Sequence, residues 1–398
     1  MLALTLLLLP SSSHTLGPSP RLGAPALAGS LAAPAGSNLS GGWTQFAPVT
    51  GQPFQRAGAA LAFDPVEGLG VVFGGRAANG TLLNDTWVND GDFPGRWGAA
   101  PYTLHVAPPP LFDAAMTFDT TLNEFLLFGG SLANGTAYNG TWVFSSFAWV
   151  DLSGHLPAAP PADRSPTMAF DPATGEVLLV SSADPGATWS FGSGGWTALP
   201  SSEWPTPTVN ATAVEDPSLG GVLLFGGQSV GSGSDPVNST WTFLSAGWQS
   251  VATARAPPSE ARPALSYDQR IPGVLLYSGL SNPSAWTYTS TGWAPWTSSP
   301  VPPARADAQL YYDSDASYDS LFGGIAANGS IDADNWGWSV PPVVLTPTLG
   351  AASIGTATWV EVGAIIAVPM VAALILRRRP PRAKPTDAPV ASASAAPS

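Results

Sequence analysis

The chain contains no cysteine, and only 10% of its 398 residues are charged. Without cysteine there can be no disulfide, no catalytic thiol and no cysteine-ligated metal. Secreted eukaryotic domains of this size usually carry disulfides. The absence of cysteine therefore favours a prokaryotic surface protein.

Positive charge is also scarce in the body of the chain. Residues 29–356 hold eight Arg, no Lys and twenty-five Asp or Glu, which gives a formal charge of −17. A domain this acidic repels phosphate backbones. We therefore expect no nucleic-acid partner.

What the sequence has in abundance is a repeat. A doublet of small residues follows a short apolar run six times, and an Asp always stands ten residues before the doublet. These repeat aspartates are Asp64, Asp119, Asp171, Asp216, Asp268 and Asp313. Successive copies lie 55, 52, 45, 52 and 45 residues apart, so length changes are confined to loops. A period near fifty residues is typical of propeller blades.

Each copy predicts four strands. The first ends at the Asp of a turn such as D-P-x-x-G, the second is wholly apolar, and two further strands each carry a Trp. The sixth copy lacks the last Trp strand, but Gly41-Gly42-Trp43-Thr44 at the start of the chain matches Gly194-Gly195-Trp196-Thr197 of the third copy. The sequence therefore predicts an all-β fold over residues 41–340, a six-bladed propeller closed by its N-terminal strand.

The segments outside the repeats predict a membrane protein. We interpret residues 1–15 as a signal peptide, 16–40 as a Pro/Gly/Ala/Ser linker, 341–353 as a Pro-rich linker and 377–398 as a basic, disordered tail. Residues 354–376 are apolar and long enough to cross a bilayer as one helix, and Arg377, Arg378 and Arg379 follow directly. This charge pattern predicts a single-pass cell-membrane protein with the propeller outside and the C-terminus in the cytoplasm.

The apolar-F-G-G run followed by Asn84-Asp85-Thr86-Trp87 and a further Trp resembles the kelch repeat and the related galactose oxidase central domain. The resemblance covers about 300 residues and implies the fold, while kelch propellers include enzymes, peptide-binding adaptors and adhesion proteins. The copper chemistry of galactose oxidase needs a Tyr–Cys crosslink, which this chain cannot form. We expect no cofactor.

Two recurring residue types are candidates for a site. The repeat aspartates could form a ring for a cation, but an Asp that opens a turn caps its own backbone amides, so we expect no metal. Four arginines precede the first strand of a copy, and we expect them to ring the mouth of the central channel: Arg56, Arg164, Arg262 and Arg305. They either grip an anionic ligand or brace neighbouring backbone as part of the repeat.

Several N-x-[ST] sites lie in turns, and the glycosylation candidates are Asn79, Asn134 and Asn328, each four residues after a doublet. We expect a binding or adhesion module for an extracellular protein, peptide or glycan, with an anionic ligand among the options. The alternatives are a membrane-anchored enzyme acting on polysaccharide and a structural envelope component. No catalytic residue is assigned, because the acids of the loops, such as Asp92, Asp163, Glu203 and Glu260, share no motif.

Overall fold

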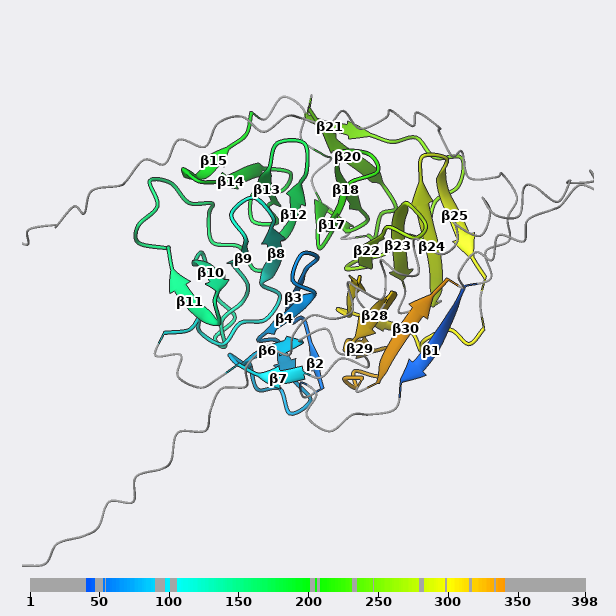
Figure 1. Cartoon of the computed structure of the whole chain (residues 1–398), viewed down its shortest axis with the longest axis horizontal. Coiled ribbons are helices and arrows are strands. Elements are labelled where there is room, and N and C mark those ends of the chain that lie inside the picture. The colour runs from blue at the N-terminus through cyan, green and yellow to red at the C-terminus, as the bar shows by residue number, and fades with distance from the viewer. Residues whose placement is uncertain are drawn as a thin grey trace, which may run out of the picture. The chain divides into compact units, whose positions relative to one another are not determined.

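The computed structural model is an all-β, six-bladed propeller, with six four-stranded antiparallel sheets arranged around a central axis (Figure 1). It describes residues 41–340 except 47–52, 54, 90–96, 101–105, 201–204, 206–207, 231–234, 246, 279–282, 298, 315–316 and 333. The predicted signal peptide, linkers, membrane helix and tail lie outside the described residues. Among the residues that the structure describes, no helix is long and apolar enough to span a membrane.

The strands of each blade run from the channel outward. The innermost strands are β3 (Ala60–Asp64), β8 (Ala115–Asp119), β12 (Thr167–Asp171), β17 (Thr212–Asp216), β22 (Ala264–Asp268) and β27 (Gln309–Asp313). The second strands are β4 (Leu69–Phe73), β9 (Glu124–Phe128), β13 (Glu176–Val180), β18 (Gly221–Phe225), β23 (Gly273–Ser278) and β28 (Tyr318–Phe322). The third strands are β6 (Thr86–Asn89), β10 (Thr141–Ser145), β14 (Thr188–Gly192), β20 (Thr240–Leu244), β24 (Ser284–Thr289) and β30 (Asn335–Ser339). The outer strands are β7 (Trp97–Ala99), β11 (Ala148–Asp151), β15 (Gly195–Ala198), β21 (Gly247–Ser250), β25 (Gly292–Trp296) and β1 (Gly42–Phe46).

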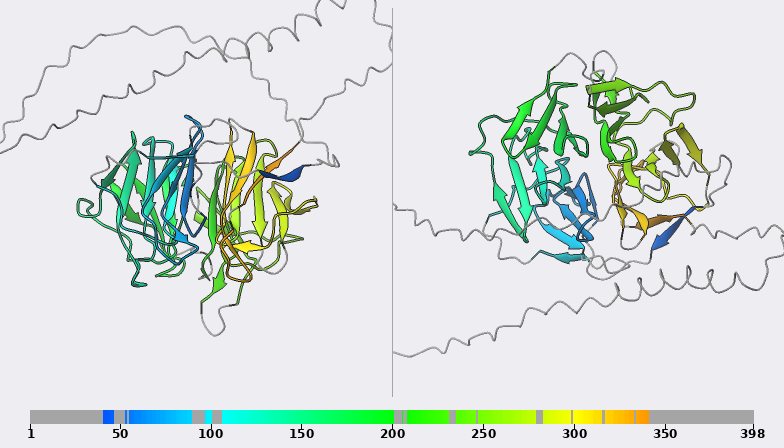
Figure 2. Two further views of the ribbon diagram at one scale, coloured as in Figure 1. Left: turned by 90° about the horizontal axis from the view of Figure 1, so that it is seen from below. Right: turned by 45° about the horizontal axis from the view of Figure 1, so that its top comes forward.

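The strand order confirms that the N-terminal segment closes the ring. β1 pairs with β30 in the sixth blade, and Trp43 lies opposite Trp338. Figures 1 and 2 show the N-terminal β1, in blue, beside β30, in orange. Because the first described strand completes the last blade, the ring is closed by hydrogen bonds between the two ends of the propeller.

The doublets place the connections between blades against the innermost strands. In four blades both doublet residues are glycines with positive φ, for example Gly74 and Gly75 at 65° and 92°. A Cβ on Gly75 would lie 2.9 Å from the carbonyl oxygen of Ala57 and 3.1 Å from the Cα of Ala59. The doublet is therefore glycine both for its backbone conformation and for this close approach.

In three blades, a two-residue strand that precedes the innermost strand pairs with a two-residue strand that follows the doublet. The pairs are β2 (Arg56–Ala57) with β5 (Arg76–Ala77), β16 (Thr208–Val209) with β19 (Gln228–Ser229), and β26 (Arg305–Ala306) with β29 (Ile325–Ala326). The doublet loops and the entrances to the blades consequently gather at one end of the channel.

A hydrogen bond between side chains links one blade to the next. The indole of the outer-strand Trp donates to the hydroxyl of the Thr that opens the third strand of the preceding blade. The four pairs are Trp149–Thr86 at 2.8 Å, and Trp196–Thr141, Trp248–Thr188 and Trp293–Thr240 at 2.9 Å each. All eight residues are buried. The Thr and Trp of the repeat therefore join blades in the core.

Candidate functional site

Two cavities divide the channel between them. The doublet-side cavity has a volume of about 170 Å³ and is lined by the first halves of the innermost strands and the residues before them. The turn-side cavity has a volume of about 320 Å³ and is lined by the second halves of those strands and the turns that follow. Both are lined by one apolar collar, consisting of Leu61, Met116, Met168, Ala213, Leu265 and Leu310. The channel therefore has two openings, one at each cavity, and different residues line them.

One position of the repeat forms the rim of the doublet-side cavity. It lies six residues before each repeat aspartate and is occupied by Gly58, Asp113, Ser165, Asn210, Arg262 and Asp307. Five of the six have φ between 55° and 60°, Ser165 being the exception. Their backbones are linked from blade to blade by three hydrogen bonds: Gly58 N–H to Asp307 C=O at 3.3 Å, and Asp113 N–H to Gly58 C=O and Arg262 N–H to Asn210 C=O at 2.8 Å each.

This rim holds four non-glycine residues in the left-handed region. Such a conformation costs a non-glycine residue roughly 1 kcal/mol, and residues of this kind concentrate at functional sites. Asn and Asp tolerate it better than most residues, but Arg262 does not share that tolerance. The strained backbone therefore includes Arg262 and the two aspartates that its side chain contacts.

Arg262 lies between two carboxylates of the rim. Its Nη1 contacts the Oδ2 of Asp113 and donates a hydrogen bond of 2.9 Å to the Oδ1 of Asp307. Within the described part of the chain its Nε and Nη2 make no hydrogen bond, and the side chain is 28% exposed. These nitrogens are donors that a ligand in the mouth can use.

The two carboxylates of this cluster share one counter-charge. Burial raises the pKa of Asp113 to about 7; the Arg262 guanidinium opposes this rise and the Asp307 carboxylate adds to it. Near neutral pH the carboxyl group of Asp113 can therefore take up a proton and act as a hydrogen-bond donor beside the guanidinium. The arrangement presents hydrogen-bond donors and acceptors side by side.

The structure does not bring the four predicted arginines into one ring. Arg56 and Arg305 lie eight residues before their repeat aspartates, are 1% and 2% exposed, and do not line the doublet-side cavity. Arg56 forms a two-pronged pair with Asp85, at 2.7 and 2.9 Å, and donates to the carbonyl oxygen of Gly74 at 2.8 Å. Arg305 repeats this arrangement with Asp334 and Gly323. Both arginines brace the doublet of their own blade.

The pKa values of the carboxyl groups paired with these buried arginines are lowered. Burial by itself raises the pKa of Asp85, but hydrogen bonding and charge from Arg56, together with the Trp87 indole, hold it below its usual range. The pKa of Asp334 is lowered in the same way by Arg305 and Trp336. The Asp of the N-D-T-W motif is therefore a scaffold residue.

Arg164 stands one residue further along the repeat than Arg56. Its side chain is exposed, it is not among the residues lining the doublet-side cavity, and it has no ion pair within the described ranges. The position of Arg56 is taken in this blade by Asp163, whose buried carboxylate accepts hydrogen bonds from the hydroxyls of Ser181 and Ser182 and the backbone of Ser182. Of the four arginines, only Arg262 lines the mouth, and a ligand-binding role for any of them stays a prediction.

The repeat aspartates occupy the turns as expected. In the first blade, for instance, Asp64 Oδ1 accepts from the backbone N–H groups of Val66 at 2.7 Å and Glu67 at 3.1 Å. Within the described ranges no three His, Asp or Glu side chains gather where they could hold a metal ion. Of the scattered acids, Asp92 and Glu203 lie outside the described residues.

The three glycosylation candidates lie in exposed turns after their doublets. The side-chain oxygens of Asn79, Asn134 and Asn328 accept hydrogen bonds from the backbone N–H groups two residues later, at 3.0, 3.0 and 2.9 Å. Their surroundings are open to solvent. Whether they carry glycans stays a prediction.

Sequence reasoning missed Asp113 and Asp307, because they belong to no motif within a blade. The signal was present in the register: aligning the copies on the repeat aspartate places both six residues upstream, level with Arg262. The same alignment separates Arg56 and Arg305 from Arg262.

Comparisons with known proteins support the fold alone. No protein-family model matches the chain, and no curated protein matches it. Among solved structures, one described as the structure of YjhT is similar, with a TM-score of 0.54 and 14% sequence identity, over 74% of this chain and 98% of that one. The chain is thus similar in architecture to a solved propeller-like structure, and its function has to be argued from its own residues.

Proposed function

We propose that this protein is a kelch-type, membrane-anchored binding module that takes a sugar residue of an extracellular glycan into the doublet-side cavity. The observation that carries the proposal is the Asp113–Arg262–Asp307 cluster on the strained rim. Carboxylates accept hydrogen bonds from sugar hydroxyls, and the free guanidinium nitrogens donate to them.

The size and polarity of the cavity favour a sugar over the other ligands considered. About 170 Å³ is below the roughly 300 Å³ at which pockets for drug-sized ligands begin. A free anion would meet the carboxyl groups of Asp113 and Asp307, which already contact Arg262 and leave the mouth with no net positive charge. A neutral, hydroxyl-rich group meets no such repulsion.

The site can be tested directly with the purified full-length chain on a glycan array. We expect saturable binding to a restricted set of glycans, with loss of binding in Asp307→Asn and retention in the exposed control Arg255→Ala. Binding to no glycan would favour the structural envelope role. If Asp307→Asn bound glycans as tightly as the parent chain, the glycan site would lie elsewhere than in the doublet-side cavity.

One observation supports an enzyme as the second candidate. The two carboxyl groups meet at one nitrogen, so they are no further apart than the roughly 5–10 Å used by glycosidases, and the pKa of Asp113 is about 7, which suits a general acid. Arg262, however, fills the space between them where a scissile bond would lie. Release of reducing sugar from a bound glycan, abolished in Asp113→Asn, would establish the enzyme instead.

The proposed membrane anchor depends on residues 354–376 and the basic cluster after them. Protease added to intact cells should remove the propeller and spare a tag placed after Ser398. Loss of the tag would overturn this topology.

A further inference from the structure

We infer that the turn-side cavity, at the opposite end of the channel, binds a small organic ammonium ion against Glu215. This site is separate from the proposed glycan site, because the collar lies between the two cavities. Three features of the described residues support it: an aromatic wall, a lone carboxylate, and an arginine beside the wall whose charge is already matched by carboxylates.

The aromatic wall comes from one position of the repeat. The residues immediately before the repeat aspartates are Phe63, Phe118, Phe170, Glu215, Tyr267 and Tyr312. All of these except Phe170 line the turn-side cavity. Four aromatic rings thus line the cavity at the position where the fourth blade supplies a carboxylate, and rings of this kind attract cations through their faces.

Glu215 is the one charged residue that lines this cavity among the described residues. Its carboxylate has no hydrogen bond or ion pair within the described part of the chain. Burial, followed by the negative charges of Asp216 and Asp171, raises the pKa of Glu215 to about 7. A cation in the cavity would provide the counter-charge that the protein itself does not.

Glu215 also lies close to the aromatic wall. Its charge is among those that raise the pKa of the Tyr267 phenol, after burial and after the charges of Asp216 and Asp268. The two residues hold the same position in successive blades and line the same cavity, so an ammonium group there can meet both a charge and a ring.

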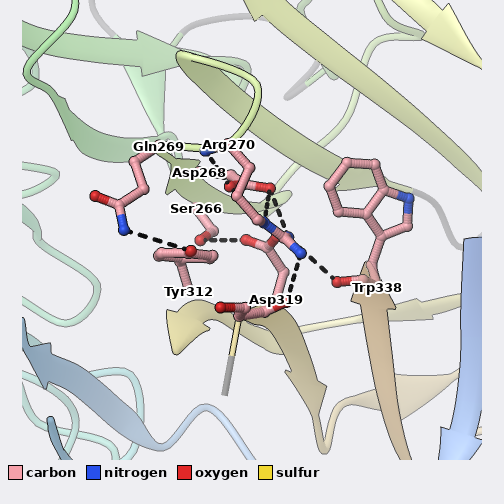
Figure 3. Close-up of polar contacts among 8 residues, drawn as sticks. Ser266, Asp268, Gln269, Arg270, Tyr312, Asp319 and Trp338 are labelled. Atoms are coloured by element: carbon pink, nitrogen blue, oxygen red, sulfur yellow. Dashed lines mark hydrogen bonds and ion pairs between the residues drawn. The ribbon is translucent and has the colours of Figure 1, made fainter. Parts of the chain in front are cut away.

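Arg270, which contacts one ring of this wall, does not compete for this role. Figure 3 shows Arg270 between Asp268 and Asp319, with contacts of 2.6 and 3.0 Å to their carboxylates. Asp268 and Asp319 are fully buried, and Ser266 donates to Asp319 at 2.8 Å. Arg270 lies 5.0 Å from the centre of the Tyr312 ring, so one ring of this wall already contacts a guanidinium. Its charge is matched within this cluster and leaves that of Glu215 uncompensated.

Choline and its neutral carbon isostere, 3,3-dimethylbutan-1-ol, are the probes that test the inference. They have nearly the same shape and differ in charge. Titration of the full chain, followed by calorimetry or NMR, should show saturable millimolar binding of choline and at least about tenfold weaker binding of the isostere.

Glu215→Gln should weaken choline binding by about tenfold or more, whereas the control Asp235→Asn, which removes one charge from an exposed loop, should leave it unchanged. Tyr267→Leu should weaken it without removing the carboxylate. A melting curve for each variant checks that it is folded. Equal binding of the two probes, equal affinity in Glu215→Gln, or no saturable binding of choline would overturn the inference. Glycan binding by the same variants shows independently whether the doublet-side proposal holds.

Discussion

Arg56 and Arg262 lie eight and six residues before their repeat aspartates, and this difference changes their surroundings. Arg56 is buried, with its guanidinium paired to Asp85 and to a doublet carbonyl. Arg262 is partly exposed and shares Nη1 between two carboxylates. A residue type recurring near the same point of a repeat can therefore occupy two different environments.

The raised pKa of Glu215 predicts how stability varies with pH. A carboxyl whose pKa is about 7 when folded and 4.5 when unfolded keeps its proton in the folded chain, where the unfolded chain releases it. Its contribution therefore lowers the free energy of unfolding as pH rises from about 4.5 to 7. Glu215→Gln should raise the melting temperature relative to the parent chain above this window, and the gain should shrink toward its acid end.

Thermal denaturation at several pH values checks this, with Asp235→Asn as the control for net charge. A melting difference that does not vary with pH would contradict the raised pKa of Glu215.

At the scale of the strands, the Trp–Thr hydrogen bond explains most of the N-x-T-W pattern. The Asn-x-Thr sites at Asn84, Asn139 and Asn238 use a Thr that is buried between blades. The fifth blade has Ala285 at this position, and the indole nitrogen of Trp43, which would be its partner, has none. The blade that closes the ring therefore lacks this bond to its neighbour.

Ala285→Thr should supply the missing acceptor. A hydrogen bond to a buried indole contributes about 1 kcal/mol, and a β-branched residue suits the strand. We expect a higher denaturant midpoint than in the parent chain, and a lower one in the opposite change, Thr240→Ala. An Ala285→Thr chain no more stable than an Ala285→Val chain would show that Trp43 gains nothing from the hydroxyl.

The closing strand itself can be tested by deletion. Removing β1 leaves β30 as an exposed edge and exposes the apolar surface against which Trp43 packs. Deleting residues 41–46 should therefore lower the melting temperature far more than deleting 16–38. Equal melting temperatures for the two truncations would contradict closure through β1.

At the scale of the whole molecule, the fold could be predicted from the sequence because the blades repeat the same turn, doublet and Trp positions. The blade number, the strand order and the closing strand follow from the spacing of these positions. The contact among Asp113, Arg262 and Asp307 was not predictable from a single blade, because these residues come from three blades and meet only when the ring closes, although the register places them at one position. Arg270 was missed for the same reason, since its partner Asp319 lies in the next blade.

The Asp of N-D-T-W carries a signal that the spacing of the repeats does not. Blades one and six have both an Asp two residues before the third-strand Trp and an Arg eight residues before the repeat aspartate, and the other four blades have neither. This co-occurrence within one chain is enough to indicate the buried pairs Arg56–Asp85 and Arg305–Asp334 from the sequence alone.

The central claim is that the mouth at Arg262 binds the ligand, whereas each buried arginine braces the doublet of its own blade. The same change at two positions tests it: Arg262→Lys and Arg56→Lys, each measured for glycan affinity and melting temperature. Lysine keeps the charge and loses the guanidinium fork. Arg262→Lys should bind about tenfold or more weakly at an unchanged melting temperature, and Arg56→Lys should lose about 2–3 kcal/mol of stability while the folded protein binds normally. The opposite pattern, with affinity lost at Arg56 and stability lost at Arg262, would contradict the account.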